Sequence, residues 1–564
     1  MARNRTDTTA TVRLTENLGT AETRALAAAM AEWSVRDKVR RLWARDKSLW
    51  TGADEDNWLG WLDIAARERR DVAALEPVAR HARNCSDVVL IGMGGSSLGP
   101  DVIAHGFGQG AGRPRFHMLD STDPDQIATV ERAIDIPRTL FIVSSKSGTT
   151  LEPNILEDYF FDRTGKAGGQ FVAVTDSGSA MEKKAGERGF AHIYFGDPAI
   201  GGRYSVLSKF GLVPAAAIGV DIAALLDGAD AMARICQGAD DNPGLRLGLT
   251  LGVLATQFRR DKVTILASPS LASVGSWLEQ LFAESTGKQG RGLIPIDGER
   301  IGPREDYGDD RVFLYLALSG DAEEDMSRQI DLLALAGHPV VRIGIDTMAQ
   351  LGGIFFMAEF ATAVAGAAIR INPFDQPDVE ASKVKTRALT DSYEKTGTLE
   401  AETPFFAADG IAAFADTPLP GGSLTEILRA HFAWAAAGDY LALLAYIERN
   451  EAHTALFDDL RVAMRHATGC ATVLGFGPRF LHSTGQAYKG GPNSGVFLQI
   501  TAAPARDLPV PGKRYSFGVV EAAQARGDLA VLSERKRRAL RVHLSNRDAG
   551  LEILAKAIAE ALKR

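Results

Sequence analysis

From residue 85 onward, the chain alternates short apolar runs, rich in β-branched residues, with segments long enough to form helices. In the first half these runs are residues 87–91, 115–119, 140–143, 171–175 and 192–195. Apolar strands separated by helices are typical of a parallel sheet that helices cover on both faces. Such sheets bind ligands in the crevice beyond the carboxyl ends of their strands. We therefore predict an α/β unit over residues 85–238, with its site at that edge.

A second set of apolar runs predicts another α/β unit of comparable size over residues 239–390. Its strands are expected at residues 262–267, 312–318, 340–345 and 368–371. Residues 1–84 instead carry apolar residues at three- and four-residue spacing, which predicts a helical N-terminal segment. The expected fold class is therefore α/β, with two parallel sheets behind a helical lead-in.

Glycine and proline punctuate residues 391–420, which predicts a loop-rich connection into a mixed C-terminal region over residues 391–564. Helices are expected in this region at residues 424–449, 454–468 and 548–564. Strands are expected at residues 472–476 and 496–501. The role of this region stays open at the level of the sequence.

Composition narrows the class of protein. The formal net charge of -8 over 564 residues leaves no evident basic face, so neither nucleic acid nor a membrane is expected as a partner. The three cysteines are far apart and form no CxxC pair, which predicts packed thiols and a cytoplasmic location. The most membrane-like stretch, residues 353–369, contains Glu359 and much alanine, so we expect a buried helix.

The motif SSKSGTT, residues 144–150, lies between an expected strand and an expected helix. Free backbone N–H groups and the helix dipole at such a junction favour an anion. The hydroxyl groups add donors, and Lys146 adds a positive charge. This motif predicts a cradle for the phosphate group of a small molecule.

Two glycine-rich turns follow other strands of the first unit. GMGGSSLGP, residues 92–100, would let a ligand approach the backbone closely, or it is only a tight turn that needs positive φ. GGRYS, residues 201–205, places Arg203 just past a strand end. That arginine could stabilise an anion, or it could lie in a solvated loop.

The segment SWLEQLFAESTGK, residues 276–288, places Gln280 and Glu284 four residues apart, on one helix face with Trp277. A carboxylate held against an aromatic side chain suits a general base. The alternative is a plain surface pair between Glu284 and Lys288.

Two further loops carry polar side chains that could face the same crevice. In NPFDQPDVEASK, residues 372–383, a proline-rich turn after the last expected strand leads into a helix with Lys383. Gln376 and Lys383 could both face the ligand, or they could belong to a capping turn and a solvated face. His482 lies in the polar loop HSTGQAYKGG, where a lone histidine is usually structural.

Together these segments resemble the glucose-6-phosphate isomerase (phosphoglucose isomerase) family. GMGGSSLGP, SSKSGTT, GGRYS, EQLFAESTGK and FDQPDVEASK stand in the family's order over residues 92–383. The resemblance implies two sugar-isomerase (SIS) domains, each a flavodoxin-like α/β/α sandwich. The C-terminal HSTGQ region is most similar to the isomerase half of bifunctional transaldolase/glucose-6-phosphate isomerases. The transaldolase half would precede residue 1 and is expected to be absent here.

The resemblance also implies an activity and a set of roles. The chain would interconvert glucose 6-phosphate and fructose 6-phosphate, in glycolysis and gluconeogenesis, through a cis-enediol(ate), with no metal and no organic cofactor. Glu284 would be the base and Arg203 would stabilise the enediolate. The phosphate would be bound by Ser145, Lys146, Ser147 and Thr150. The sugar hydroxyls would be contacted by Gly95, Ser96 and Gln280. Closure over the ligand would involve Gln376 and Lys383.

One departure from the family concerns ring opening. The common form of the family has a histidine between the base segment and the FDQ segment, supplied by the partner subunit, which implies a homodimer. No histidine fits that place here, so His482 and Lys383 are the two candidates for opening the sugar ring.

Other functions remain open beside the isomerase. They are a non-catalytic sugar-phosphate sensor, a transaldolase and a side activity on mannose 6-phosphate.

Overall fold

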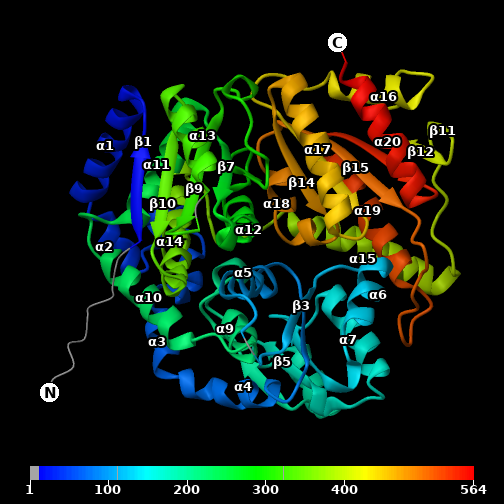
Figure 1. Ribbon diagram of the computed structural model, residues 1–564, viewed down its shortest axis with the longest axis horizontal. Helices are drawn as coiled ribbons and strands as arrows, with labels where there is room; N and C mark the ends of the chain where they lie inside the picture. The colour runs from blue at the N-terminus through cyan, green and yellow to red at the C-terminus, as the bar shows by residue number, and fades with distance from the viewer. Residues whose placement is uncertain (1–11, 111, 322, 564) are drawn as a thin grey trace.

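Three sheets of mainly parallel strands, each with helices on its faces, build the protein (Figure 1). The structure is a computed structural model that describes residues 12–110, 112–321 and 323–563. The first eleven residues of the predicted N-terminal segment lie outside the described residues. Two of the sheets have five strands and the third has six.

The first sheet has the strand order β3-β2-β4-β5-β6, and all its pairs are parallel. Every strand predicted for this unit is confirmed: β2 (Asp87–Gly92), β3 (Arg115–Leu119), β4 (Thr139–Ser144), β5 (Phe171–Thr175) and β6 (His192–Phe195). The connecting helices are α5 (Leu98–Phe107), α6 (Pro124–Ala133), α7 (Leu151–Arg163), α8 (Ala180–Arg188) and α9 (Lys209–Ala217). The strand order reverses between β2 and β4, where doubly wound sheets bind their ligands.

The second sheet repeats this order as β8-β7-β9-β10, and β1 adds to its edge antiparallel to β10. Its strands are β7 (Lys262–Ala267), β8 (Ile294–Asp297), β9 (Arg311–Leu318), β10 (Val340–Ile345) and β1 (Arg13–Asn17). Its helices are α10 (Ile222–Ile235), α11 (Pro243–Phe258), α12 (Val274–Thr286), α13 (Glu324–Leu335), α14 (Leu351–Ile369) and α15 (Val379–Thr396).

The strand predicted at residues 368–371 is wrong, because helix α14 continues to Ile369 and ends at Arg370 with a φ of 64°. A short apolar run cannot be assigned to a strand or to a buried helix by periodicity alone. The stretch Met348–Ile369 is long and apolar enough to cross a membrane, but 89% of its window is buried inside the protein. As predicted, α14 is a core helix, and it packs against α10, α11 and α12.

The N-terminal segment is helical as predicted, apart from strand β1. It contains α1 (Thr20–Val35), α2 (Lys38–Trp43), α3 (Ile64–Arg70) and α4 (Glu76–Ala82), joined by short 3-10 turns. Its apolar side chains, among them Leu26 and Trp61, belong to one core with the first two sheets. The segment therefore joins the two units rather than forming a separate body.

The C-terminal region is a third α/β unit, which the sequence analysis left as a mixed region. Its sheet has the order β14-β13-β15-β16 in parallel, extended by the antiparallel strands β12 and β11. The strands are β11 (Phe406–Ala408), β12 (Ile411–Phe414), β13 (Tyr440–Tyr446), β14 (Ala471–Phe476), β15 (Gly495–Ala502) and β16 (Arg538–Leu544). The helices are α16 (Leu424–Phe432), α17 (Glu451–Thr468), α18 (Gly485–Gly490), α19 (Phe517–Glu534) and α20 (Arg547–Ala561).

The helix predicted at residues 424–449 is correct only in its first part. Helix α16 ends at Phe432, and the apolar run YLALLAY forms the inner strand β13 instead. That run is buried throughout, so no polar face marks its period. The other predicted elements of this region, at residues 454–468, 472–476, 496–501 and 548–564, are present as α17, β14, β15 and α20.

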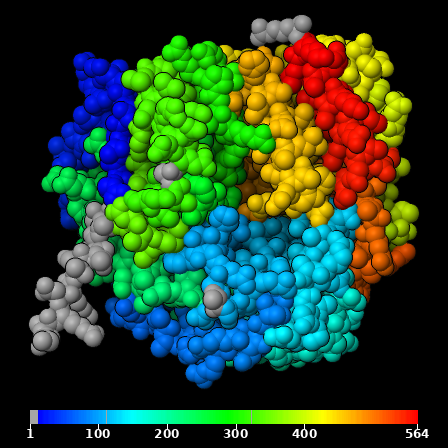
Figure 2. Space-filling view, viewed as in Figure 1, coloured from blue at the N-terminus to red at the C-terminus, as the bar shows by residue number. Residues whose placement is uncertain are grey.

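The third unit has its own core but is packed against the other two. Phe517 and Val520 of α19 join the apolar cluster on one face of the first sheet. Strand β8 lies beside β14, so the second and third sheets meet edge to edge. In the surface view, the first unit lies below the other two and meets both (Figure 2). We keep the boundaries near residues 84, 238 and 390 as a proposal, because the strands of each sheet, except for β1, fall within one of these ranges. Helix α15 crosses the last boundary, so the first residues of the predicted loop-rich connection, 391–396, are helical.

Candidate active site

A cavity of about 430 Å³ opens at the carboxyl ends of β2 and β4, where the order of the first sheet reverses. All the residues predicted for the site line it. They are Gly95, Ser96, Ser145, Lys146, Ser147, Thr150, Arg203, Gln280, Glu284, Gln376, Lys383 and His482. The first unit supplies the loops of one wall, α12 and α15 of the second unit supply another, and His482 comes from the third.

The predicted phosphate cradle forms the loop between β4 and α7. The hydroxyl groups of Ser144 and Ser145 are buried and have no hydrogen-bond partner among the described residues. Buried donors without partners are costly, so they favour a polar ligand in the cavity. The N-terminus of the 13-residue helix α7 adds free N–H groups at the same point. The loop is therefore suited to an anion.

Two details of this loop depend on its neighbours. Gly148 has a φ of 68°, and a Cβ atom there would lie 2.3 Å from the backbone nitrogen of Met181, so the close approach requires glycine. The Lys146 ammonium forms an ion pair with Asp176. The positive charge of Lys146, which the sequence analysis assigned to phosphate binding, is therefore already paired with the carboxylate of Asp176.

Helix α12 places Gln280 and Glu284 on the face that looks into the cavity. Gln280 Nε2 donates to Glu284 Oε2 at 3.0 Å and to the backbone oxygen of His482 at 2.9 Å. Trp277 does not form the expected aromatic wall, because it packs into the core against Phe355 with ring centroids 4.9 Å apart. Glu284 therefore has polar rather than aromatic neighbours.

Arg203 is buried beside Glu284, and the alternative of a solvated loop arginine is wrong. Its Nη1 lies 3.5 Å from Glu284 Oε1 and donates to Gln376 Oε1 at 2.9 Å. Its Nε donates to Ser285 Oγ at 2.7 Å, and its Nη2 donates to the backbone oxygen of Pro373 at 2.7 Å. These hydrogen bonds hold the Arg203 guanidinium in place, with its positive charge beside the carboxylate of Glu284.

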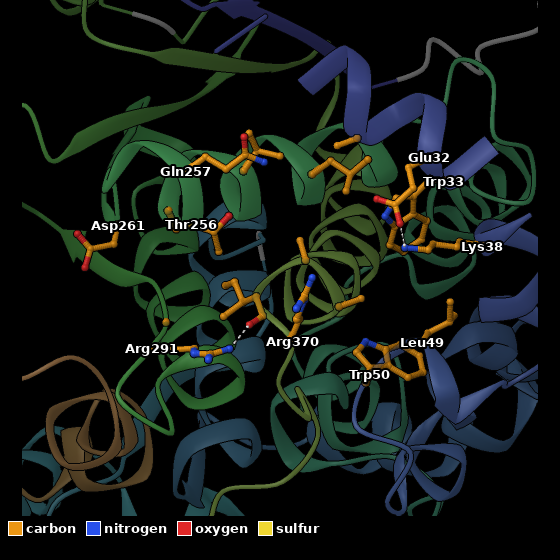
Figure 3. Close-up of a pocket in the computed structure, with 18 of the residues that line it drawn as sticks. Glu32, Trp33, Lys38, Leu49, Trp50, Thr256, Gln257, Asp261, Arg291 and Arg370 are labelled. Atoms are coloured by element: carbon orange, nitrogen blue, oxygen red, sulfur yellow. Dashed lines mark hydrogen bonds and ion pairs between the residues drawn. The ribbon is translucent and has the colours of Figure 1, made fainter. Parts of the chain in front are cut away.

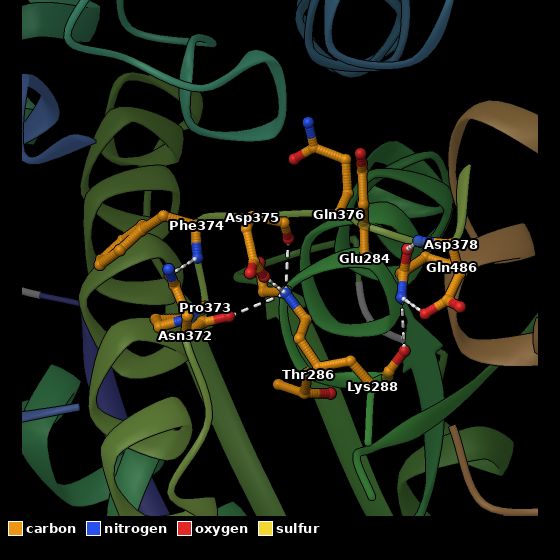
Figure 4. A network of polar contacts seen from close by, with 12 residues as sticks. Glu284, Thr286, Lys288, Asn372, Pro373, Phe374, Asp375, Gln376, Asp378 and Gln486 are labelled. Carbon is orange, nitrogen blue, oxygen red and sulfur yellow. Dashed lines mark hydrogen bonds and ion pairs between the residues drawn. The ribbon is translucent and has the colours of Figure 1, made fainter. Parts of the chain in front are cut away.

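The loop that carries Gln376 is fixed by a buried lysine (Figure 4). Lys288 Nζ donates to the backbone oxygen of Asn372 at 2.8 Å and to Asp375 Oδ1 at 2.6 Å. Burial, together with the nearby charge of Arg203, lowers the pKa of Lys288 to about 8. The alternative of a surface pair between Glu284 and Lys288 is therefore wrong.

A strand was expected before this loop, but residues 372–376 follow helix α14 instead.

Lys383 lies at the cavity mouth on α15. Its side chain is 43% exposed and its Nζ lies 3.7 Å from Glu380 Oε2. Lys383 is thus the more solvent-accessible of the two ring-opening candidates, since the His482 side chain is 12% exposed.

His482 reaches the cavity at the end of the short 3-10 turn that follows β14. Its Nε2 lies 2.9 Å from Glu152 Oε1. Burial raises the pKa of Glu152, but the charge and hydrogen bond of His482 lower this pKa by a larger amount. The pKa of Glu152 therefore lies below its ordinary value. The contact therefore joins an imidazole to an ionised carboxylate.

Glu152 in turn is held from the third unit. Gln524 Nε2 of α19 donates to Glu152 Oε1 at 2.6 Å, and Thr122 Oγ1 donates to Gln524 Oε1 at 2.7 Å. The sequence analysis missed both Glu152 and Gln524. The one sequence signal for Glu152 was its place as an acidic residue in the first turn of α7, the helix behind the cradle. No local pattern marks Gln524.

The glycine loop lets these groups meet. Gly94 has a φ of 57°, and a Cβ atom there would lie 2.7 Å from both Gln280 Nε2 and the backbone oxygen of His482. At Gly95 a Cβ atom would lie 1.9 Å from the backbone oxygen of Gly202. The tight-turn alternative for this loop is therefore correct in part, and the turn also brings three units together.

A larger cavity of about 830 Å³ lies elsewhere, between α1 and the C-terminal end of α14 (Figure 3). Trp33, Trp50, Arg291 and Arg370 are among its lining residues. None of the residues predicted for the site line it. Size alone would place the chemistry there, but the carboxylate, guanidinium and imidazole groups converge in the smaller cavity.

Comparisons with known proteins show which family the chain resembles. The family model for phosphoglucose isomerase matches residues 70–299. A glucose-6-phosphate isomerase from Heliobacterium modesticaldum is 30% identical over 424 residues, which cover 63% of this chain and 92% of that protein. One from Symbiobacterium thermophilum is 29% identical over 390 residues, which cover 58% of this chain and 86% of that protein.

Solved structures show the same fold. A hypothetical protein from Thermus thermophilus has a TM-score of 0.55 and 26% identity, over 67% of this chain and 99% of that chain. A glucose-6-phosphate isomerase from Chlamydia trachomatis has a TM-score of 0.51 and 22% identity, over 63% of this chain and 78% of that chain. At that identity the second likeness carries the fold alone.

Proposed function

The chain belongs to the glucose-6-phosphate isomerase family, and on that premise we propose how its cavity performs the reaction. It is an aldose–ketose isomerase that interconverts glucose 6-phosphate and fructose 6-phosphate. The proposed route is proton transfer between C2 and C1 through a cis-enediol(ate). The contact between Glu284 and Arg203 carries the proposal, because it places a proton acceptor beside a fixed positive charge.

The substrate's phosphate is proposed to bind the loop of Ser145, Lys146, Ser147 and Thr150. The unpartnered Ser145 hydroxyl and the N-terminus of α7 support this assignment. Gly95, Ser96 and Gln280 would then contact sugar hydroxyls from the opposite wall. In this pose the sugar's first two carbons lie toward α12.

Glu284 is proposed to remove the proton from C2 of the aldose and return it to C1, which gives the ketose. Negative charge develops on the sugar oxygens as the proton leaves, and a preorganised guanidinium stabilises such charge without reorganising. The four hydrogen bonds of Arg203 to Ser285, Gln376, Pro373 and Asp375 support this role. Gln280 would hold the Glu284 carboxylate through its 3.0 Å hydrogen bond.

His482 is proposed to open the sugar ring by proton transfer with the ring oxygen and the anomeric hydroxyl. The ionised Glu152 beside it keeps the imidazole oriented, as a carboxylate does for a catalytic histidine. Lys383 is the second candidate. Its exposed position at the mouth supports a part in closing over the ligand instead.

The dimer implied by the resemblance stays a prediction, and with His482 in the ring-opening role the proposed site needs no residue from a partner subunit. His482 and all the other proposed residues line the cavity from one chain. The likeness to bifunctional transaldolase/isomerases and the cytoplasmic location also stay predictions, as does a side activity on mannose 6-phosphate.

The test is conversion of fructose 6-phosphate by the purified full chain, coupled to glucose-6-phosphate dehydrogenase and followed as NADPH, in the presence of EDTA. Turnover that Glu284→Gln abolishes supports the proposal. Binding of fructose 6-phosphate without turnover would contradict it and favour the sensor. A Schiff base trapped by borohydride would favour a transaldolase.

A further inference from the structure

Besides the catalytic cavity and the larger one beside α1, a further cavity of about 450 Å³, which we call the second cavity, lies where the three units meet, and nothing in the proposed reaction uses it. Asp297 at the end of β8, Arg449 beyond β13 and Phe476 at the end of β14 line it from one side. Helix α5 of the first unit closes it from the other side with Asp101 and other residues. The carboxyl ends of parallel strands are where doubly wound sheets bind ligands.

Three arginines face this cavity with N–H groups to spare. Arg449 lines the cavity and is exposed, and its side chain makes no hydrogen bond or ion pair with any described residue, although the charges of Asp101, Asp120 and Asp297 act on it. Arg479 Nη1 and Arg461 Nε are buried and have no partner among the described residues. Arg311 and Arg465 also leave an Nε unpaired inside a buried ion network, so it is the place of the other three arginines beside a cavity that makes them available to an anionic group.

Arg461 and Arg479 make other contacts, which limit how far each can turn toward a ligand. Arg461 is 4% exposed and donates to the backbone oxygens of Asp297 at 2.7 Å and Thr472 at 2.9 Å. Arg479 lies 3.4 Å from Asp120 and 3.7 Å from Asp101. Arg449 is therefore the arginine best placed to hold an incoming anion, with Arg479 beside it.

Carboxyl groups lie next to these arginines in the same cavity. They belong to Asp101, Glu279, Asp297 and Asp458. Burial and the neighbouring Asp297 raise the pKa of Glu279 to about 8, so this group carries its proton near neutral pH. Four carboxyl groups beside three guanidinium groups exclude a site for a bare polyanion. They suit a compound that carries one anionic group and several hydroxyl groups.

We propose that this cavity is a second site for a phosphorylated polyhydroxy compound, bound by its phosphate to Arg449 and Arg479 and by its hydroxyls to the carboxyl groups. Its volume is similar to the about 430 Å³ of the catalytic cavity. The N-terminus of the 18-residue helix α17 lies two residues beyond Arg449 and adds a favourable dipole.

The two cavities share one wall, the segment from residue 479 to residue 484. Arg479, Phe480, Ser483 and Thr484 line the second cavity, whereas His482 lines the catalytic one. Binding to one site must therefore be separated from binding to the other by substitutions that each affect one cavity.

The experiment counts bound glucitol 6-phosphate, an acyclic compound that has no carbonyl group and cannot be isomerised, by equilibrium dialysis against the full chain. We expect two molecules per chain. Arg449→Ala should weaken one site by about tenfold or more, since it removes a charge-assisted contact, while fructose 6-phosphate turnover persists. The double variant Ser145→Ala, Ser147→Ala should weaken the other site. Arg300→Ala, which removes an exposed arginine outside both cavities, is the matched control and should change neither.

A single molecule per chain whose binding Arg449→Ala leaves unchanged would overturn the proposal. So would two sites that Arg449→Ala leaves unchanged. The second site does not depend on the proposed catalytic roles. If those roles fail, binding sensitive to Arg449→Ala remains while binding sensitive to the serine substitutions is lost.

Discussion

Glu152 and His482 are 330 residues apart in the chain, yet Oε1 of the first lies 2.9 Å from Nε2 of the second. Glu152 comes from the helix behind the phosphate cradle, and His482 comes from the third unit. The contact therefore completes the cavity from two α/β units of one chain. It also explains how a histidine that does not fit the family's usual place in the sequence can still line the cavity.

This contact predicts which residue opens the ring. His482→Ala should lower kcat for fructose 6-phosphate by about 10²- to 10⁴-fold, the usual contribution of a positioned acid or base. Glucitol 6-phosphate, which has no ring to open, should still bind. The comparison is Lys383→Ala, which removes an exposed cation and should cost less than about tenfold. A greater loss of kcat in Lys383→Ala than in His482→Ala would reverse the assignment.

The same contact predicts acid sensitivity. His482 lowers the pKa of Glu152 against the opposing effect of burial, so the folded pKa lies below the ordinary value of 4.5. A carboxyl group of this kind adds stability above its unfolded pKa and loses it as the pH falls through its folded pKa. Urea denaturation from pH 6 down to about pH 3 should therefore show a smaller loss of unfolding free energy below about pH 4.5 in Glu152→Gln. Equal slopes in both proteins would contradict the pairing.

The phosphate cradle predicts a separate effect on binding. Ser145→Ala removes a buried hydroxyl that has no protein partner, so it should raise KM for fructose 6-phosphate about tenfold and leave the fold intact. Ser179→Ala is a suitable control, because that hydroxyl caps α8 in the same unit and already has partners. An unchanged KM in Ser145→Ala would place the phosphate elsewhere.

The assembly of the cavity from one chain predicts that turnover does not require a partner subunit. Specific activity should stay constant on dilution through the range in which sedimentation shows any dimer to dissociate. Activity that falls in step with dissociation would mean that a second chain completes the site.

The site residues could be predicted because each one lies in a local motif at the end of a strand or on a helix face. Ser145, Arg203 and Glu284 are examples, and strand order then brings their motifs to one cavity. Gln524 could not be predicted. It sits in the middle of α19, and only the packing of the third unit on the first places it 2.6 Å from Glu152.

The third sheet shows a different limit. Its inner strand β13 is apolar on both faces, so its sequence fits a buried helix equally well. Strand β1 was missed because it pairs at a sheet edge with β10, and β12 was missed because it joins the sheet through β16, each partner lying far along the chain. Local periodicity does not reveal which strands pair when they are far apart in the chain.

The central claim is that Glu284 moves the proton, and a comparison with another glutamate of α12 tests it most directly. Glu284→Gln and Glu279→Gln each replace a carboxyl group on the same helix, and only the first of these groups faces the catalytic cavity. Turnover of fructose 6-phosphate should fall by about 10²- to 10⁴-fold in Glu284→Gln and persist in Glu279→Gln. Both variants should still bind glucitol 6-phosphate in the cavity of Ser145. Turnover that survives in Glu284→Gln would contradict the assignment of the base.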